Sequence, residues 1–249
     1  MSRLETIYGL HAVRSVLLRQ PERVALLRIA ERRDDVRMRE IEELARKHGR
    51  PVQRVDARTL GRALGDVAHQ GVAADVEPLP HWTEDDLLGA LEHATDPLLL
   101  ALDGVQDPHN LGACLRTADA CGALAVIVPR DRAASLNAAA RKVAAGAAET
   151  TPVVTVTNLV RTLGLLKGAG LWSVGAEAEA PSLAQEIDMT GGIVLVLGAE
   201  GAGLRQLTRQ TCDFRVRLPR LGAVESLNVS VAAGMLLYEA VRQRALKSA

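Results

Sequence analysis

The stretch Ile193-Val194-Leu195-Val196-Leu197-Gly198-Ala199-Glu200-Gly201-Ala202-Gly203 decides the fold. Five consecutive branched apolar residues that end at a glycine predict a strand buried on both faces, as in parallel sheets. The glycines allow a sharp turn and a close approach of the backbone to another group. The sequence therefore predicts a central strand whose carboxyl end opens into a glycine-rich loop.

Two further elements follow this loop. Residues 214–219 form a short apolar stretch typical of a strand, and polar residues separate it from a helix. In that helix, apolar residues recur with a period near 3.6 from Val229 to Val241, and Ser226 or Asn228 can cap its start. Loops at the carboxyl ends of parallel strands bind ligands in open α/β sheets, although three ordinary turns would leave the same pattern.

The region before Ile193 alternates strand and helix patterns. Residues 97–102 form a buried strand, and Asn110 is the expected N-cap of a helix over 111–121. The other expected elements are strands over 123–128, 153–156 and 171–174, helices over 134–148 and 158–167, and a helical turn over 181–184. This alternation predicts an α/β fold with a mainly parallel sheet and helices on both faces.

Residues 1–76 have the pattern of a separate, small α/β module. Its expected elements are a helix opened by residues 8–13, strands over 24–29, 51–55 and 71–76, and helices over 36–48 and 57–64. Pro78 and Pro80 then mark an interdomain linker. We therefore expect one domain over 1–76, a linker with a first helix over 77–96, and a second domain over 97–249.

The chain has 249 residues and a formal net charge of zero, so no global basic field indicates nucleic acid. Residues 1–80 carry a net charge of +3 and the remainder −3. The basic residues of the first part are nearly all arginine, which suits phosphate contacts, although a solvated helix face explains them nearly as well. The candidate contacts are Arg14, Arg19, Arg32, Arg33, Arg37 and Arg39.

The cysteines and histidines exclude several kinds of site. The three cysteines form no CxxC pair, and Cys114 and Cys121 fit a helical pattern as buried apolar residues, which is typical of a reducing cytosol. All six histidines precede Asn110, which excludes a histidine-based triad or metal site from the remainder, and we expect no metal. We find no signal peptide and no apolar run near the roughly 18 residues of a membrane span, and we expect a soluble, cytoplasmic protein without a membrane partner.

Three stretches resemble the signatures of the SpoU (TrmH-like) branch of the SPOUT methyltransferases. Asp107-Pro108-His109-Asn110-Leu111-Gly112 with Arg116-Thr117-Ala118 resembles the first signature, and Leu195 to Leu204 resembles the second. Leu218-Pro219 with residues 225–232 resembles the third. The matches lie in the family's order and spacing over residues 103–240, and together they are specific where one alone would be weak.

The N-terminal stretches 8–13 and 69–73 resemble the ribosomal-protein-L30e-like substrate domain of the RlmB-type members. The resemblance implies S-adenosylmethionine-dependent 2′-O-methylation of a guanosine ribose in the peptidyl-transferase region of bacterial 23S rRNA. It also implies a deep trefoil knot in the C-terminal domain and a homodimer. True knots are rare, and composition and periodicity do not predict one.

The resemblance further implies where the cofactor sits. The positions that match its cofactor loops are Gly198, Leu218 and Leu227, together with Leu197, Gly201 and Gly203. The backbone of the first three matches the positions that hold adenine and ribose. Glycine at 198, 201 and 203 leaves room for a close backbone approach, although a plain strand-to-helix turn also explains it.

Arg116 is the expected catalytic residue, because the resemblance implies that it activates the ribose 2′-hydroxyl. An ordinary guanidinium does not deprotonate, so stabilising the developing alkoxide and clamping the adjacent phosphate are physically easier roles. A surface ion pair with Asp107 or Asp119 is the alternative reading of this residue.

Four polar residues complete the predicted catalytic site. Asn110 is a helix cap, an active-site ligand or both, and Glu200 in the glycine loop holds Arg116, accepts a proton or is a solvated turn residue. Asn228 and Ser226, at the start of the last helix, bond the substrate or only cap the helix.

Three other functions stay open from the sequence. The first is a nucleotide-dependent oxidoreductase that uses the loop from Gly198 to Gly203. That loop reads G-x-x-G-x-G, unlike the dinucleotide-binding pattern G-x-G-x-x-G, and no acidic residue ends the following strand at Leu218, where a ribose partner would be needed. Loss of Arg116 or Glu200 would have favoured a non-catalytic RNA-binding protein, and both are present. A tRNA ribose methyltransferase is the third alternative, against which residues 1–76 argue by resemblance only.

Overall fold

The computed structural model describes residues 4–31, 35–65, 67, 69–78, 82–224 and 226–247. The chain divides into two compact units, of which the first is Met1–Pro80 with Ala145–Thr150 and the second is His81–Ala144 with Thr151–Ala249. Each unit has a sheet of its own.

The first unit contains a four-stranded sheet in the order β1-β4-β2-β3. Its elements are β1 (Glu5–Tyr8), α1 (Leu10–Arg19), a 3-10 turn (Pro21–Arg23), β2 (Val24–Ala30), α2 (Val36–Lys47), β3 (Val52–Val55), α3 (Ala57–Leu64) and β4 (Val72–Val76). Strand β4 runs antiparallel to β1 and β2, whereas β2 and β3 are parallel. The unit is therefore a mixed-sheet α/β module.

Packing in the first unit follows the apolar periodicity of its helices. Buried residues of α1 and α2 share one core with the sheet, and Leu60 of α3 packs in a second cluster with Ala30 and Ala73. The expected helix opened by residues 8–13 needs correction, because Tyr8 ends strand β1 and the helix begins at Leu10. A four-residue antiparallel strand is too short to leave a clear alternation in the sequence.

The second unit contains a seven-stranded sheet in the order β7-β6-β5-β10-β8-β11-β9, and every pairing in it is parallel. Its first elements are α4 (Glu84–Leu91), β5 (Leu98–Asp103), α5 (Pro108–Ala120), β6 (Ala125–Pro129), α6 (Ala138–Ala144), β7 (Val153–Val156) and α7 (Leu159–Gly168). A 3-10 turn, Ala147–Glu149, follows α6 and falls in the first unit. The later elements are β8 (Trp172–Ala176), β9 (Ser182–Leu183), a 3-10 turn (Ala184–Glu186), β10 (Ile193–Gly198), α8 (Gln206–Thr211), β11 (Phe214–Arg217) and α9 (Val229–Lys247).

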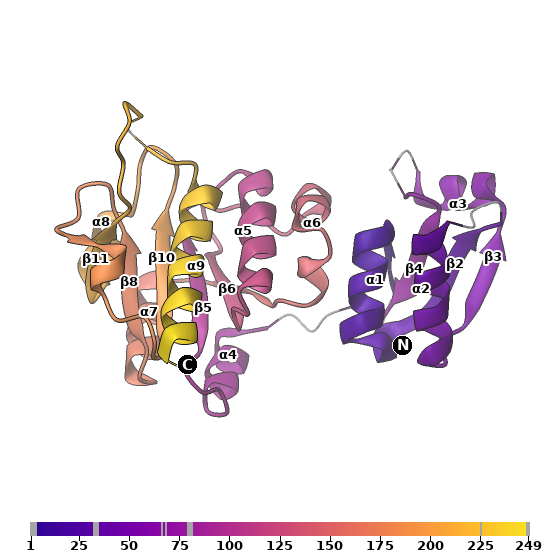
Figure 1. Ribbon diagram of the computed structural model, residues 1–249, viewed down its shortest axis with the longest axis horizontal. Helices are drawn as coiled ribbons and strands as arrows, with labels where there is room; N and C mark the ends of the chain where they lie inside the picture. The colour runs from indigo at the N-terminus through magenta and orange to yellow at the C-terminus, as the bar shows by residue number, and fades with distance from the viewer. Residues whose placement is uncertain are drawn as a thin grey trace. The chain divides into compact units, whose positions relative to one another are not determined.

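The predicted α/β layers with a buried central strand are confirmed. Strand β5 is buried along its whole length, and β10 is buried up to Leu197. Helices α5, α6 and α9 lie side by side, with α9 across β10 (Figure 1). Leucines of α4 and α7 pack with β5 and β10 in another cluster. Such burial on both faces explains the unbroken apolar runs of the two central strands.

Two local expectations differ from the structure. The helical turn expected over 181–184 is wrong, because Ser182–Leu183 pairs with β11 as strand β9 and a 3-10 turn follows it. Helix α8 was not predicted, since its six residues lack a clear apolar period. Among the helices of the described ranges, none combines the length and the apolar character that a bilayer crossing requires.

Candidate active site

The carboxyl ends of β5 and β10 lie next to each other. Gly198 pairs with Asp103 in the parallel register, and Asp103 is only 1% exposed. Its Oδ2 accepts a hydrogen bond of 2.9 Å from the backbone N–H of Arg205, whose Nε lies 3.5 Å from Oδ1. The far end of the glycine loop is therefore tied back to β5. Asp103 was not among the predicted site residues, although an acidic residue at the end of an otherwise apolar strand was a usable signal.

The glycine loop closes on itself in a tight turn. The N–H of Gly203 donates to the carbonyl of Ala199 at 2.8 Å. A Cβ at Gly198 would lie 1.9 Å from the carbonyl carbon of Gly203, which no real contact allows. Gly201 and Gly203 have φ angles of 77° and 66°, in the left-handed region that favours glycine. Glycine is thus needed at position 198 because the backbone of Gly203, in the same loop, lies against it.

Helix α5 begins earlier than the sequence suggested. The carboxylate of Asp107 accepts a hydrogen bond of 2.9 Å from the N–H of His109, and Pro108 is the first helical residue. The prediction of Asn110 as the N-cap is therefore wrong. Proline fits the first helical position because it lacks an N–H that would otherwise be unsatisfied, and aspartate is a favoured cap before it. The amide side chain of Asn110 is consequently available for another partner.

That partner is Asn228. Its Nδ2 donates to Oδ1 of Asn110 at 3.0 Å. The Oδ1 of Asn228 accepts from the N–H of Ser230 at 2.9 Å and from its Oγ at 2.6 Å, so Asn228 also caps α9. One side chain thus fixes the start of α9 and joins it to the first turn of α5. The structure brings together these two members of the predicted site.

No hydrogen bond or ion pair between described residues joins the other three predicted catalytic residues to one another. Arg116 is exposed on α5, and within the described part of the chain no hydrogen bond or ion pair reaches its guanidinium. The alternative ion pair with Asp107 or Asp119 is therefore not found there. Glu200 is exposed in the glycine loop, and Ser226 is exposed before α9. Glu225 of the third signature lies outside the described residues.

The loops around Gly198 and after β11 have the chemistry needed to hold an adenosine group. Leu197 is buried, while Leu218 and Leu227 are half-buried and present apolar surface. Among described residues, no backbone–backbone hydrogen bond engages Leu218 or positions 221–224, so their N–H and C=O groups can serve a ligand. The residues present therefore fit a nucleoside held by backbone groups and leucine side chains.

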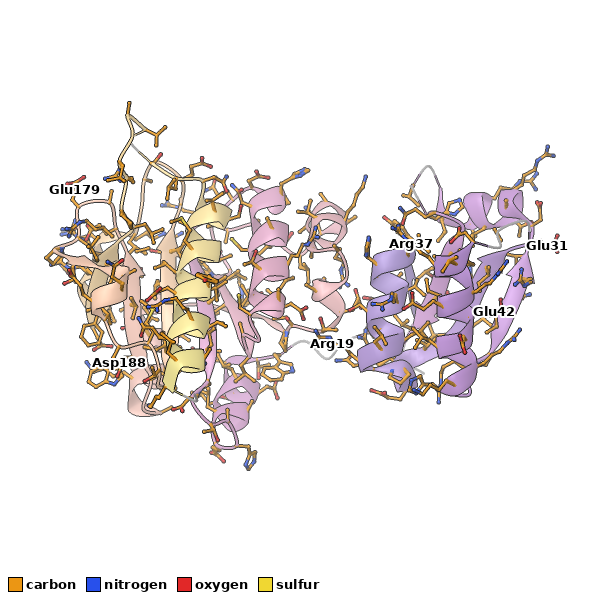
Figure 2. All side chains as sticks on the ribbon, viewed as in Figure 1. Arg19, Glu31, Arg37, Glu42, Glu179 and Asp188 are labelled. Atoms are coloured by element: carbon orange, nitrogen blue, oxygen red, sulfur yellow. The ribbon has the colours of Figure 1, made fainter. Side chains whose placement is uncertain are left out.

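The predicted phosphate contacts of the first unit have mixed surroundings. Arg14 forms an ion pair of 2.7 Å with Glu40, and Arg19 and Arg39 also have partners. Arg37 is exposed in the first turn of α2, and Figure 2 shows it at the opposite end of the α1–α2 helix pair from Arg19. Arg32 and Arg33 lie outside the described residues.

The cysteines are poor nucleophiles in this environment. Burial raises the pKa of the Cys114 thiol to about 12. Burial, and then the nearby charges of Asp213, Asp103 and Glu177, raise the pKa of Cys212 to about 12. Within the ranges that the structure describes, no group of three or more His, Cys, Asp or Glu residues could hold a metal ion. Neither thiol nor metal chemistry is thus indicated by the described residues.

The model of the SpoU rRNA methylase family matches residues 97–238, which is more than half of the chain and contains both asparagines of the site. The chain belongs to the SpoU rRNA methylase family. A second model, of the substrate-binding domain of RNA 2′-O ribose methyltransferases, matches residues 6–82. The two matches correspond to the two sheets of this family member.

Relatives resemble this SpoU chain over its full length. The 23S rRNA (guanosine-2′-O-)-methyltransferase RlmB of Pseudomonas aeruginosa is 54% identical and that of Coxiella burnetii 51%; each alignment covers 98% of both chains. The crystal structure of the SpoU methyltransferase AviRb from Streptomyces viridochromogenes, in complex with the cofactor AdoMet, is 26% identical with a TM-score of 0.75. That match covers 98% of this chain and 91% of AviRb.

Proposed function

We propose that this protein transfers a methyl group from S-adenosylmethionine to the ribose 2′-hydroxyl of a guanosine in 23S rRNA. Identity near 50% over the full length to relatives with that activity supports the substrate. The observation that carries the proposal is the hydrogen bond between Asn110 and Asn228, because it joins the first and third signatures at the carboxyl edge of the sheet. The peptidyl-transferase region is the proposed target.

The cofactor, when bound, supplies a methyl group on a sulfonium, which needs no metal. Gly198, Leu218 and Leu227 hold its adenosine part through backbone groups, and Leu197, Gly201 and Gly203 shape the same loops. Support comes from the half-buried leucines and from Leu218, whose N–H and C=O make no backbone–backbone hydrogen bond to another described residue. Holding the donor through backbone groups orients it without the ordering of long side chains.

Arg116 provides the positive charge that the developing 2′-alkoxide requires. A guanidinium stays protonated at neutral pH, so it stabilises the oxyanion and clamps the neighbouring phosphate instead of removing the proton. Its exposure, without a partner in the described part of the chain, leaves it available to RNA. Asn110 and Asn228 position the substrate or the loops, and Glu200 and Ser226 contact the RNA or the guanidinium.

We further propose that the C-terminal domain is a trefoil knot and that the protein is a homodimer in the cytoplasm. The family membership supports the knot. The exposed apolar residues Val231, Met235 and Tyr238, at helical spacing on α9, support a self-association surface close to Asn228. Residues 1–76 bind the RNA, residues 77–96 form the linker and a first helix, and residues 97–249 carry catalysis.

The proposal is tested with purified protein, labelled S-adenosylmethionine, and separate transcripts of 23S rRNA and tRNA. We expect label in one guanosine of the peptidyl-transferase region, located by mapping 2′-O-methyl sites. Label in tRNA alone would reassign the enzyme to tRNA. Binding of RNA with no binding of S-adenosylmethionine in a calorimetric titration would make it a non-catalytic RNA-binding protein.

A further inference from the structure

A cavity lies away from the glycine loop, at the edge strand β7. It has a volume of approximately 430 Å³ and is enclosed by β7, by the residues before and at the start of α4, and by the first turns of α7. The side chains that matter for its chemistry are Trp82, Glu84, Arg130, Thr155, Thr157 and Arg161. All of them belong to the second unit. This volume is within the range of small-molecule sites.

The charge of the cavity favours an anion. Arg161 forms an ion pair with Glu84, whose carboxylate also accepts a hydrogen bond of 2.6 Å from Thr162 Oγ1. Arg130 is exposed, and no side-chain hydrogen bond or ion pair of this residue occurs between described residues. Two guanidinium groups against one carboxylate leave a net charge of +1 at the cavity. A phosphate group is the natural partner for an unpaired guanidinium.

The cavity also offers an aromatic ring and free backbone groups. Trp82 is half-buried and packs against the apolar core, so one side is fixed while the other lines the cavity. The carbonyl of Val156 accepts from the N–H of Arg130 at 2.8 Å, which directs the backbone groups of Val156 toward β6. By the two-residue period of a strand, the N–H and C=O of Thr155 point outward, where β7 has no strand partner among described residues.

The cavity and the methyl-transfer site share one edge of the sheet. Arg130 directly follows β6, and the next two residues reach the site. The carbonyl of Asp131 accepts from Arg205 Nη2 at 3.4 Å, and the carbonyl of Arg132 lies 3.7 Å from where a Cβ of Gly104 would be. Strands β7 and β5 are two places apart, which is roughly 10 Å. A short stretch of one RNA strand can therefore occupy both places.

We propose that this cavity binds a single-stranded nucleotide of the RNA substrate beside the target guanosine. Arg130 holds its phosphate, the base stacks on Trp82, and the outward backbone of Thr155 bonds the base edge. A cationic group next to an aromatic platform is the usual means of holding unpaired nucleotides. This inference rests on the proposed function, since it assumes an RNA substrate.

The first test uses the fluorescence of Trp82. The chain has two tryptophans, and Trp172 lies at the amino end of β8, where its ring is 5.8 Å from that of Phe214. Trp172→Phe keeps an aromatic pair there and leaves Trp82 as the sole tryptophan. Saturation with a single-stranded RNA fragment of the target region should quench this emission strongly. The matched variant Trp82→Phe, which retains Trp172, should show no quenching.

The second test removes the charge. Arg130→Ala should weaken binding of the same RNA about tenfold and lower the slope of log affinity against log salt by about 0.7, as expected for one lost phosphate contact. Arg130→Lys should recover most of the affinity. Arg215→Ala on β11, at the other side of the sheet, is the control for the loss of one exposed arginine. In methylation assays KM for RNA should rise more than kcat falls.

The outcomes separate the two proposals. The cavity assignment would be overturned, and the function left intact, by the following result. The wild type methylates 23S rRNA, RNA does not change the emission of Trp82, and Arg130→Ala binds RNA with the same salt slope as the wild type. A wild type that methylates no RNA would remove the proposed function itself. Quenching by guanosine monophosphate as strong as by RNA would assign the cavity to a free nucleotide, and quenching only by an acidic peptide would assign it to a protein partner; either result overturns the inference.

Discussion

Asn228 donates a hydrogen bond of 3.0 Å to Asn110, although 118 positions separate them in the sequence. The side-chain Oδ1 of Asn228 accepts hydrogen bonds from the N–H and the Oγ of Ser230. The loop before α9 and the first turn of α5 are thus held by one amide. This bond fixes the distance between the loop before α9 and the helix that carries Arg116.

Asn228→Ala should lower methylation by roughly tenfold or more while the protein stays folded. The substitution removes both the link to Asn110 and the cap of α9, and a lost cap costs about 1 kcal/mol in the free energy of unfolding. Ser230→Ala is the control, because it keeps the Asn110–Asn228 bond. A double-mutant cycle with Asn110→Ala should give a coupling energy of about 1 kcal/mol. Additive effects of the two substitutions would show that the bond contributes nothing.

Arg116→Ala should abolish turnover, by a factor of about 10² or more, because a preorganised charge next to a developing oxyanion is worth several kcal/mol. S-adenosylmethionine affinity, measured by calorimetry, should stay within twofold of the wild type, since cofactor binding is assigned to other loops. Arg116→Lys should restore only part of the rate, because a lysine lacks the bidentate geometry. A full methylation rate in the alanine variant would remove Arg116 from the mechanism.

Gly198→Ala should destroy cofactor binding. Its Cβ would lie 1.9 Å from Gly203, so the loop has to open and the adenosine site is lost. We expect at least a tenfold loss of S-adenosylmethionine affinity together with a lower Tm. Gly164→Ala in α7 is the matched control, because no atom lies within 4 Å of its Cβ position. Alanine in a helix interior stabilises by about 0.5–1 kcal/mol relative to glycine, so the control should melt slightly later.

The three thiols should differ in reactivity. Burial raises the pKa of Cys114 and Cys212 to about 12, whereas Cys121 is half-buried and its pKa is also raised by burial. At pH 8, a disulfide reagent should label the half-buried Cys121 first, then the half-buried Cys212, and Cys114 only after unfolding. Cys121→Ser should remove the early reaction. Rapid labelling of Cys114 in the folded protein would contradict its burial.

Cys114 and Cys212 also make stability depend on pH. The pKa of these two thiols is near 9 in the unfolded chain and about 12 in the folded one, so the unfolded state loses protons first. This contribution is complete below pH 9 and disappears as the pH rises toward 12. Cys114→Ala with Cys212→Ala should therefore flatten the decline of the unfolding free energy above pH 9, measured by urea denaturation against the wild type.

Self-association should depend on the exposed side of α9. Tyr238→Glu together with Met235→Glu places two charges on the surface proposed to pair with a second copy, where burying unpaired charge is costly. In sedimentation experiments we expect a dimer for the wild type and a monomer for this variant. Leu207→Glu on α8, also an exposed leucine, should remain dimeric. A wild-type protein that sediments as a monomer would rule out the homodimer.

The sequence by itself determined the α/β class, the two buried central strands and the family. A run such as 193–197 has few physical solutions, because branched apolar residues bounded by glycines have to be covered on both faces. The short elements β1, β9 and α8 were not predicted, since two to six residues carry too little periodicity. The N-cap of α5 was misplaced because Asn110 and Asp107 are both favoured caps, and only the position of Pro108 in the helix separates them.

Only the tertiary structure decided which of the predicted polar residues meet. It joined Asn110 to Asn228 and added Asp103 as the anchor of the glycine loop. It also showed that residue 198 has to be glycine, because a Cβ there would collide with the backbone of Gly203. It also placed Trp82 and Arg130 in the lining of one cavity, which could not be predicted from two residues so far apart in the sequence. The physical reason is that local patterns record how a segment packs against its nearest neighbours, whereas contacts between distant loops depend on strand order and register, which no single segment encodes.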